Sequence, residues 1–183
     1  QDIKKKRELK YLDDNFIRKR IENYLKKNRL EISDADLKRR NKRYVKFFKD
    51  IRKELRIVYG VFRDAREKRS LDAFREIFSL IGDFNSLLDL GCGLNPLDYI
   101  KLNKKAEYYC CDVNINEINL VNKYFKKNKI CGKAFVFDLV FDDIHKLPDA
   151  DAILLFRVLE SLEYYERDIS ERILKNLKCK TIV

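Results

Sequence analysis

An apolar run that leads directly into a glycine turn constrains the fold of this chain more than any other feature. The run ends at Leu90, and Gly91 and Gly93 follow it. Asn95 is then placed to cap a helix that has Pro96 at its first position. A strand, a Gly-x-Gly turn and a helix, in this order, bring the backbone of a parallel α/β sheet close to a nucleotide-like ligand. The segment therefore predicts an α/β fold with a ligand site at the turn.

Short apolar runs alternate with helical patterns from residue 81 onward. Strands are expected over residues 86–90, 107–112, 134–139, 152–156 and 181–183. Helices are expected between them, over residues 96–104, 115–128 and 161–177. This alternation predicts a parallel sheet with helices on both of its faces.

The first 80 residues have the apolar spacing of helices instead. Apolar side chains recur at intervals of three and four from Leu9 to Leu25, which predicts the first helix. A second helix is expected to begin after Ser33 and to end at Gly60, and a third to end at Gly82. The aromatic residues on these helices are expected to lie in the core. We predict a helical unit before the α/β unit.

The positive charge of the chain is concentrated in the helical unit. The net charge is +11, and residues 1–80 hold 26 Lys and Arg against 14 Asp and Glu, whereas residues 81–183 hold 15 against 16. A segregated basic region favours a polyanion partner, because each cation placed on a phosphate releases condensed counterions. We therefore predict a domain over 1–80 that docks RNA or DNA, and a ligand-binding domain over 81–183. The alternative is a set of solvated charged helices.

The cysteines argue against a metal site or a disulfide framework. Their number is odd, no C-x-x-C pair occurs, and the single histidine, His145, lies far from them. Buried free thiols in a reducing cytosol are expected for Cys92, Cys110, Cys111, Cys131 and Cys179. The chain has no apolar run of the roughly 20 residues that a membrane span needs and no secretory signal, so we expect a cytoplasmic protein.

Acidic residues follow the predicted strands at the positions that an adenosine would need. Asp112 lies 21 residues beyond Gly91 and could accept hydrogen bonds from both ribose hydroxyls. Asp138 could accept from an adenine amine, while the backbone N–H of Leu139 donates to a ring nitrogen. Each residue alone could form a turn or cap a helix. Together, in this order, they favour an adenosine-containing ligand.

The turn itself narrows the choice of ligand. A dinucleotide motif would need a third glycine where this chain has Pro96, which lacks the N–H that a pyrophosphate would bind. No G-K-[ST] follows the glycines, which excludes a P-loop. Asp89, just before the glycines, suits a ligand with a cationic amino-acid end. S-adenosylmethionine fits this description.

Residues 89–97 resemble the first motif of class I S-adenosylmethionine methyltransferases. Their Gly-Leu-Asn-Pro-Leu ending, residues 93–97, is similar to that of the Arm/Rmt (FmrO-like) 16S ribosomal RNA methyltransferases of aminoglycoside resistance. The resemblance extends over about residues 44–183. It implies a helical N-terminal domain, a Rossmann-like sheet, the cofactor S-adenosylmethionine, and methylation of guanine N7 at the decoding site of the small ribosomal subunit.

The resemblance also implies roles for individual residues. Gly91 and Gly93 would surround the methionine part of the cofactor, Asp112 would bind the ribose, and Asp138 with Leu139 would contact the adenine.

Two arginines complete the site that the resemblance implies. Arg66 aligns with an arginine that binds the cofactor carboxylate, for which a guanidinium is suited because it donates two parallel hydrogen bonds. Arg157 aligns with a basic residue on the substrate side. Two departures from the family are Arg63-Asp64, in place of His-Ala, and the end of the chain at Val183. We therefore expect a sheet that is truncated at its fifth strand.

The implied chemistry needs no proton-transfer residue. Guanine N7 has an exposed lone pair and no proton, so catalysis would consist of positioning and desolvation. No Asn-Pro-Pro-Tyr-like motif and no Pro-Cys nucleophile is present, and His145 is expected on the surface. We expect a monomer that acts on ribosomal RNA or the 30S subunit. The alternatives are a methyltransferase for tRNA or a small molecule, and an inactive RNA-binding module with a methyltransferase fold.

Overall fold

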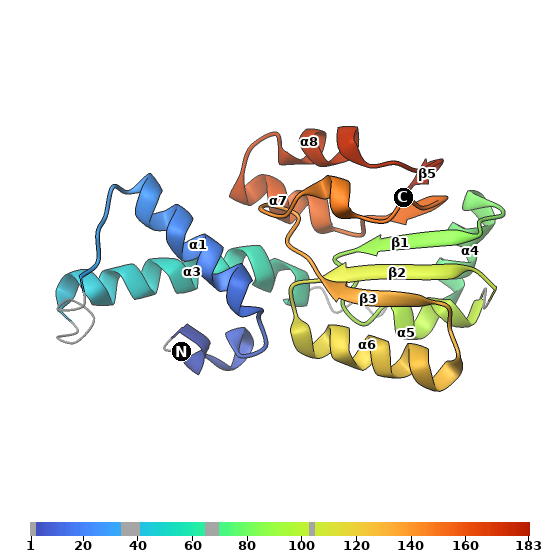
Figure 1. Cartoon of the computed structure of the whole chain (residues 1–183), viewed down its shortest axis with the longest axis horizontal. Helices are drawn as coiled ribbons and strands as arrows, with labels where there is room; N and C mark the ends of the chain where they lie inside the picture. Colours follow the sequence, from blue (N-terminus) through green and yellow to red (C-terminus); the bar gives the residue numbers. More distant parts are fainter. Residues whose placement is uncertain (1–2, 34–40, 65–69, 103–104) are drawn as a thin grey trace.

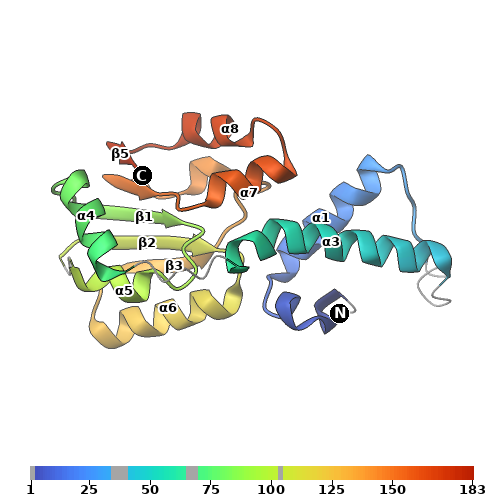
Figure 2. The same cartoon turned by 180° about the vertical axis from the view of Figure 1, so that it is seen from behind.

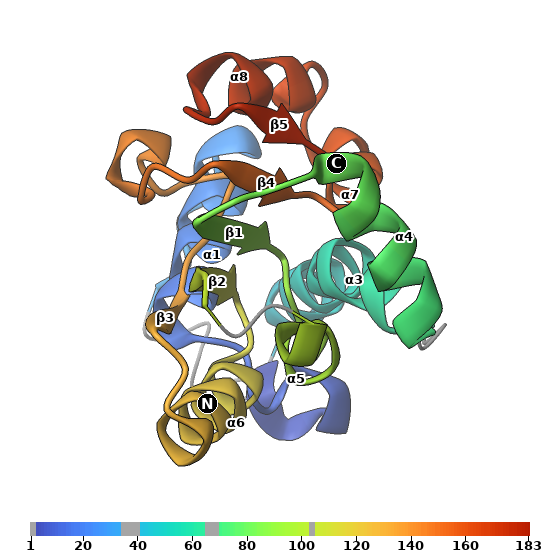
Figure 3. The ribbon, with the colours of Figure 1, turned by 90° about the vertical axis from the view of Figure 1, so that its right-hand side faces the viewer.

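Five parallel strands form one sheet in the order β3-β2-β1-β4-β5 (Figure 3). In the computed structural model, residues 3–33, 41–64, 70–102 and 105–183 are described. The strands are β1 (Ser86–Leu90), β2 (Glu107–Asp112), β3 (Gly132–Val136), β4 (Ala152–Leu154) and β5 (Thr181–Ile182). The predicted parallel α/β sheet is confirmed.

Helices cover both faces of the sheet. Successive side chains of a strand point to opposite sides, and both sides of these strands carry apolar side chains that the helices bury. One face packs against α4 (Leu71–Ile81), α5 (Pro96–Tyr99) and α6 (Ile115–Asn128), and Leu87 joins that core. The other face packs against α7 (Val158–Tyr165) and α8 (Ile169–Asn176), and Leu88 and Leu90 join that core. Both cores are apolar, as expected for a buried parallel sheet. The short 3-10 helices η3 (Ile100–Leu102) and η4 (Ile144–Lys146) complete this unit.

The N-terminal helices lie beyond the carboxyl ends of the strands (Figures 1 and 2). They are η1 (Ile3–Lys5), η2 (Arg7–Leu9), α1 (Asp14–Lys27) and α3 (Lys42–Asp64). A third core joins them to one another, and its buried members are Ile3, Leu9, Leu12, Phe16, Ile17, Phe47, Ile51, Leu55 and Tyr59. Phe16 and Phe47 therefore lie in this core, with Tyr24 and Phe48 packed against it, as predicted for the aromatic residues of these helices.

The segment before α1 is hydrogen-bonded to the turn between β2 and α6. Leu12 and Asn114 form an antiparallel bridge. The Asp13 N–H donates to the Val113 carbonyl at 3.1 Å, and the Ile115 N–H donates to the Tyr11 carbonyl at 3.1 Å. The N-terminal segment is thus fixed to the edge of the sheet where β2 ends.

The helix that was expected to end at Gly60 continues to Asp64. Glycine costs about 1 kcal/mol relative to alanine inside a helix, which is small compared with tertiary packing. Tyr59, directly before Gly60, is only 5% exposed and packs in the N-terminal core. The predicted start of this helix after Ser33 is wrong, because α3 begins at Lys42 and the Asn41 side chain accepts from the Tyr44 N–H at 2.9 Å. Residues 34–40 lie outside the described residues.

Other element boundaries also differ from the prediction. Strands β3 and β4 end at Val136 and Leu154, earlier than expected, so Asp138 and Phe156 lie in the following loops. The helix expected over residues 161–177 is two helices, α7 and α8, because the chain turns at Asp168, whose φ is +64°.

The start of α5 and the end of α4 lie where the sequence predicts them. Pro96 begins α5 as predicted, but the Asn95 side chain makes no capping hydrogen bond. Gly82 ends α4 as predicted, with a φ of +77°. Phe74 of α4, which comes before residue 80, packs in the same core as Leu87 of β1. The division into domains over 1–80 and 81–183 stays a prediction.

Candidate functional site

The glycine turn after β1 approaches both β2 and α7. The N–H groups of Gly91 and Cys92 both donate to the Cys111 carbonyl at 2.9 Å, which fixes the turn against the end of β2. Gly91 has a φ of +72°, and a Cβ there would lie 2.6 Å from Cγ2 of Val158. Only glycine fits this position without strain, because L side chains disfavour positive φ and the space is filled.

Asp112, the predicted ribose ligand, is half-buried at the end of β2, beside the glycine turn. Its Oδ2 accepts from the Gly93 N–H at 3.1 Å, and its Oδ1 accepts from the Asn114 N–H at 2.8 Å. These bonds join the ends of β1 and β2 through one carboxylate.

Asp89, predicted to face the cationic end of the ligand, is 1% exposed within β1. The Tyr99 hydroxyl donates to its Oδ2 at 2.8 Å. Burial, and next the negative charge of Asp89, raises the pKa of Tyr99 well above its usual range, so the hydroxyl stays protonated and donates. Asp89 is therefore buried just before the turn, and Tyr99 of α5 orients its carboxylate.

Cys92 lies inside the glycine turn but is not equipped for nucleophilic chemistry. It is 1% exposed, and burial followed by contact with Cys110 raises the pKa of its thiol well above the usual range. A thiol attacks as the thiolate, so this residue is inert at neutral pH. Cys110 and Cys111 are buried as predicted, but the prediction of a buried thiol is wrong for Cys131, which is exposed.

Asp138 and Leu139, the predicted adenine contacts, lie in the loop after β3. The Asp138 carboxylate is buried and is bound by Arg20 of α1, whose Nη1 contacts Oδ2 and whose Nη2 donates to Oδ1 at 3.2 Å. The Val140 N–H also donates to Oδ1, at 3.0 Å. Among the described residues, none accepts a hydrogen bond from the Leu139 N–H. This donor fits the role predicted for Leu139.

The remaining predicted residues differ in how far the structure describes them. Arg157 is exposed directly before α7, and its backbone has a φ of +58°, which is uncommon for a residue other than glycine. Arg66 lies among residues 65–69, outside the described part of the chain. His145 is exposed in η4, as predicted for a surface residue.

Sequence reasoning missed the contribution of the N-terminal helices to this edge of the sheet. The sequence prediction gave Arg20 no role beyond its charge and gave Tyr59 no role. The structure places Arg20 on Asp138 and joins the Tyr59 hydroxyl to the Asn114 side chain. Arg20 recurs with the apolar positions Phe16 and Ile17 at intervals of four and three, which is the one sign that it lies on the buried face of its helix.

The described residues hold neither a cluster suited to a metal ion nor a helix suited to span a membrane. Across residues 3–33, 41–64, 70–102 and 105–183, no group of three or more His, Cys, Asp or Glu side chains could hold a metal ion. No helix in that same part of the chain is long and apolar enough to cross a membrane.

The sheet order, the glycine turn after β1 and the acidic residue that ends β2 define a Rossmann-like methyltransferase fold. The solved structure of the 16S rRNA methyltransferase RmtF, in complex with S-adenosyl-L-homocysteine, has this fold. It matches 97% of this chain and 75% of its own, with a TM-score of 0.72 and 18% identity.

Two curated proteins narrow the similarity to one kind of methyltransferase. The chain is 29% identical over 121 residues to the 16S rRNA (guanine(1405)-N(7))-methyltransferase of Micromonospora echinospora, which is 64% of this chain and 43% of that protein. It is 32% identical over 100 residues to the enzyme of the same name from Micromonospora rosea, which is 53% of this chain and 36% of that protein. No protein-family model matches the chain. The chain thus spans less than half the length of these curated relatives. The resemblance to 16S rRNA guanine-N7 methyltransferases, predicted from the glycine turn, is confirmed.

Proposed function

We propose that this chain binds S-adenosylmethionine and transfers its methyl group to N7 of a guanine in 16S ribosomal RNA. One observation supports the proposal most: Gly93, Asp112 and the Leu139 N–H lie at the carboxyl ends of neighbouring parallel strands, where ligands of doubly wound sheets bind. The curated relatives carry this activity in their names.

The strand ends suit the parts of S-adenosylmethionine in order. Gly93 gives the methionine part close access to the backbone, since nothing lies nearer than 3.8 Å to the place of its Cβ, whereas Gly91 lets the turn pack against Val158. Asp89 is buried just before them in β1. Asp112 would accept from the ribose hydroxyls. The Leu139 N–H would donate to the adenine ring, and the proposed role of Arg66 is to bind the cofactor carboxylate.

Transfer to guanine N7 needs no proton acceptor. The N7 lone pair attacks the methyl carbon while the bond from that carbon to sulfur breaks, and the bonding electrons remain on sulfur as the neutral thioether of S-adenosylhomocysteine. The methylated base takes the positive charge that the sulfonium loses. The protein therefore needs to hold the two reactants in line and to exclude water. Arg157, exposed after β4, is our candidate for a contact to the target nucleotide.

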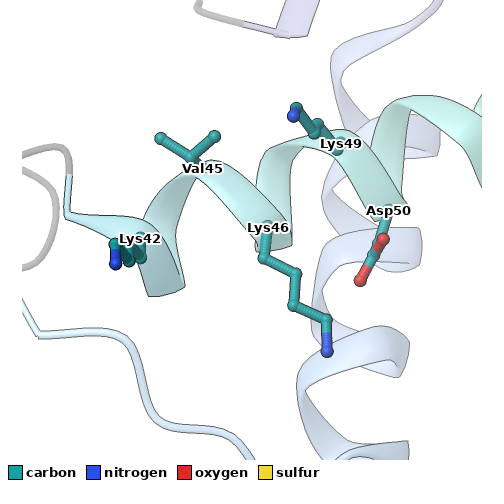
Figure 4. A pocket seen from close by; sticks show the side chains of 5 residues that line it. All are labelled: Lys42, Val45, Lys46, Lys49 and Asp50. Carbon is teal, nitrogen blue, oxygen red and sulfur yellow. The ribbon is translucent and has the colours of Figure 1, made fainter.

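The surface of α3 suits an RNA backbone. Exposed basic residues follow one another along this helix at intervals of four and three, which places them on one face: Lys42, Lys46, Lys49, Lys53 and Arg56. Three of them line a hollow of about 360 Å³ together with Val45 and Asp50 (Figure 4). We call these five cations the α3 basic stripe. It spans roughly 20 Å at 1.5 Å per residue, long enough for several phosphates.

Ligand binding is the first test of the proposal. S-adenosylhomocysteine at 100 times its dissociation constant should stabilise the folded chain by about 2.7 kcal/mol, seen as a rise in Tm. Asp112→Ala should abolish the rise, whereas Asp98→Ala, which removes an exposed carboxylate on α5, should leave it unchanged. No rise at millimolar ligand would refute the cofactor proposal.

The substrate is tested by methyl transfer to defined RNAs. The chain is incubated with S-adenosylmethionine and with 30S subunits, protein-free 16S rRNA or tRNA. Methylated guanine N7 is then located by borohydride and aniline cleavage followed by reverse transcription. We expect one stop in 16S rRNA. Incorporation into tRNA alone would refute the substrate, and cofactor binding without any transfer would support an inactive module instead.

A further inference from the structure

Arg20 is a fully buried arginine on the helix that faces the ligand edge of the sheet. Its exposed fraction is 0%, and its guanidinium lies 3.9 Å from the ring centre of Phe16, 4.9 Å from that of Phe141 and 5.0 Å from that of Tyr165. Burying an unpaired charge costs several kcal/mol, so such a residue needs a strong partner. Aromatic rings alone supply only part of this.

The partner is the carboxylate of Asp138. Two nitrogens of Arg20 contact its two oxygens, and among the described residues the Nε of Arg20 has no acceptor. A fork of two parallel hydrogen bonds fixes the direction of a carboxylate as well as its position. The Asp138 N–H donates to Oδ2 of Asp142 at 2.8 Å, so the backbone at this residue is fixed too.

This pair lies where the adenine end of the cofactor is proposed. Leu139 follows Asp138 directly, and its N–H is the proposed donor to the ring. The described residues place three donors on the Asp138 carboxylate, two from Arg20 and one from Val140. A carboxylate has about four lone-pair sites, so one acceptor site remains. The 6-amino group of adenine needs one acceptor.

We propose that Arg20 is a positioning residue for adenine recognition: it turns the Asp138 carboxylate so that its remaining lone pair accepts from the 6-amino group. The inference rests on the proposed binding of S-adenosylmethionine. It makes α1 part of the cofactor site, although α1 belongs to the basic N-terminal helices. Docking of those helices and adenine selectivity are then linked through one ion pair.

The test compares two ligands that differ at a single group. One is S-adenosylhomocysteine. The other, called here the deaminated analogue, has hydrogen in place of the 6-amino group, so that its base is purine and not adenine. Titration calorimetry on the full chain should show that the analogue binds about tenfold more weakly, as expected for the loss of one hydrogen bond to a charged group. In Arg20→Lys, which keeps the charge but loses the fork, this preference should fall below about threefold.

A matched control separates recognition from general loosening of the fold. Lys19→Met removes the neighbouring ion pair between α1 and the same loop, Lys19 to Asp142, without touching the Asp138 carboxylate. It should keep the tenfold preference. A variant that merely loosens the fold weakens both ligands equally and leaves their ratio unchanged. Arg20→Lys with the full preference would therefore overturn the inference while leaving the cofactor proposal intact.

Nuclear magnetic resonance of the unmodified chain covers the case in which Arg20→Lys does not fold. The Nη resonances of Arg20 should shift on saturation with S-adenosylhomocysteine and shift less with the deaminated analogue. Unchanged resonances with bound S-adenosylhomocysteine would overturn the inference. Failure of the unmodified chain to bind either ligand would instead refute the proposed function, and the inference with it.

Discussion

The side-chain amide of Asn114 donates to the Tyr59 hydroxyl at 2.5 Å, and both residues are buried. The bond joins α3 to the first turn of α6, next to the end of β2. The Oδ1 of the same side chain accepts from the N–H groups of Asn116 and Glu117 at 3.0 and 3.3 Å. One asparagine therefore caps a helix and attaches the N-terminal helices to the sheet.

Asn114→Ala should lower the free energy of unfolding by about 2–3 kcal/mol, since it removes an N-cap and a buried hydrogen bond. Asn114→Ser should cost less, because serine can cap α6 but cannot reach Tyr59. Urea denaturation measures both, and an Asn114→Ser variant as stable as the parent would show that the contact to Tyr59 contributes nothing. Asn128→Ala serves as the control, because Asn128 is exposed at the other end of α6.

The two glycines of the turn should respond differently to alanine. Gly91→Ala combines a positive φ with a Cβ only 2.6 Å from Val158, and we expect a loss of about 3 kcal/mol or more. Gly93→Ala has a φ of +52° but nothing nearer to its Cβ than 3.8 Å, so we expect only the 1–2 kcal/mol of backbone strain.

A second substitution tests the cause at Gly91. Val158→Ala removes the side chain that the new Cβ would meet, so in its presence Gly91→Ala should cost no more than Gly93→Ala. The comparison is a double-mutant cycle measured by thermal unfolding. Purely additive losses would mean that the backbone conformation alone requires the glycine.

The sequence predicted those parts of the fold that depend on residues close together in the chain. β1, β2 and α6 have the predicted bounds, because alternating apolar runs, glycines and caps are local features. The placement of Asp112 beside the glycine turn also followed, since parallel strands end at one edge of a sheet. The bounds depend on neighbours within a few residues, and the placement of Asp112 depends only on the parallel pairing of β1 and β2.

The parts that the sequence did not predict depend on contacts across the chain. Arg20 and Asp138 are 118 residues apart, and no local pattern connects a basic helix to a distant acidic loop. The continuation of α3 through Gly60 depends on the packing of Tyr59 against the other N-terminal helices. Propensity is a weak determinant where tertiary packing opposes it. The site was therefore predicted for the sheet and missed for the helices above it.

Glu54 of α3 should make the stability of the chain depend on pH. Burial raises its pKa above the ordinary 4.5, although Arg20 and Tyr165 act in the opposite direction. The folded chain then binds a proton more tightly than the unfolded chain. Stability from this group is complete below the unfolded pKa and is lost as pH rises through the raised folded pKa.

Glu54→Gln should remove this loss, so the variant should unfold at a higher Tm than the parent at pH 7. The two should converge as the pH approaches 4.5. Glu22→Gln, on the exposed surface of α1, is the control and should behave like the parent. A lower Tm for Glu54→Gln at pH 7 would mean that attraction between Glu54 and Arg20 outweighs the burial of the carboxylate.

The α3 basic stripe should determine how 30S binding depends on salt, if the proposed substrate is correct. Changing Lys42, Lys46 and Lys49 to glutamine should weaken binding and flatten the plot of log affinity against log salt by about one unit for each lost phosphate contact. Three lysines of α6 provide a control of equal charge, because Lys123, Lys126 and Lys127 are exposed on another surface. Their replacement should leave the slope nearly unchanged, since bulk charge acts less than direct phosphate contacts. Equal effects of the two triple variants would show that net charge, and not the stripe, attracts the RNA.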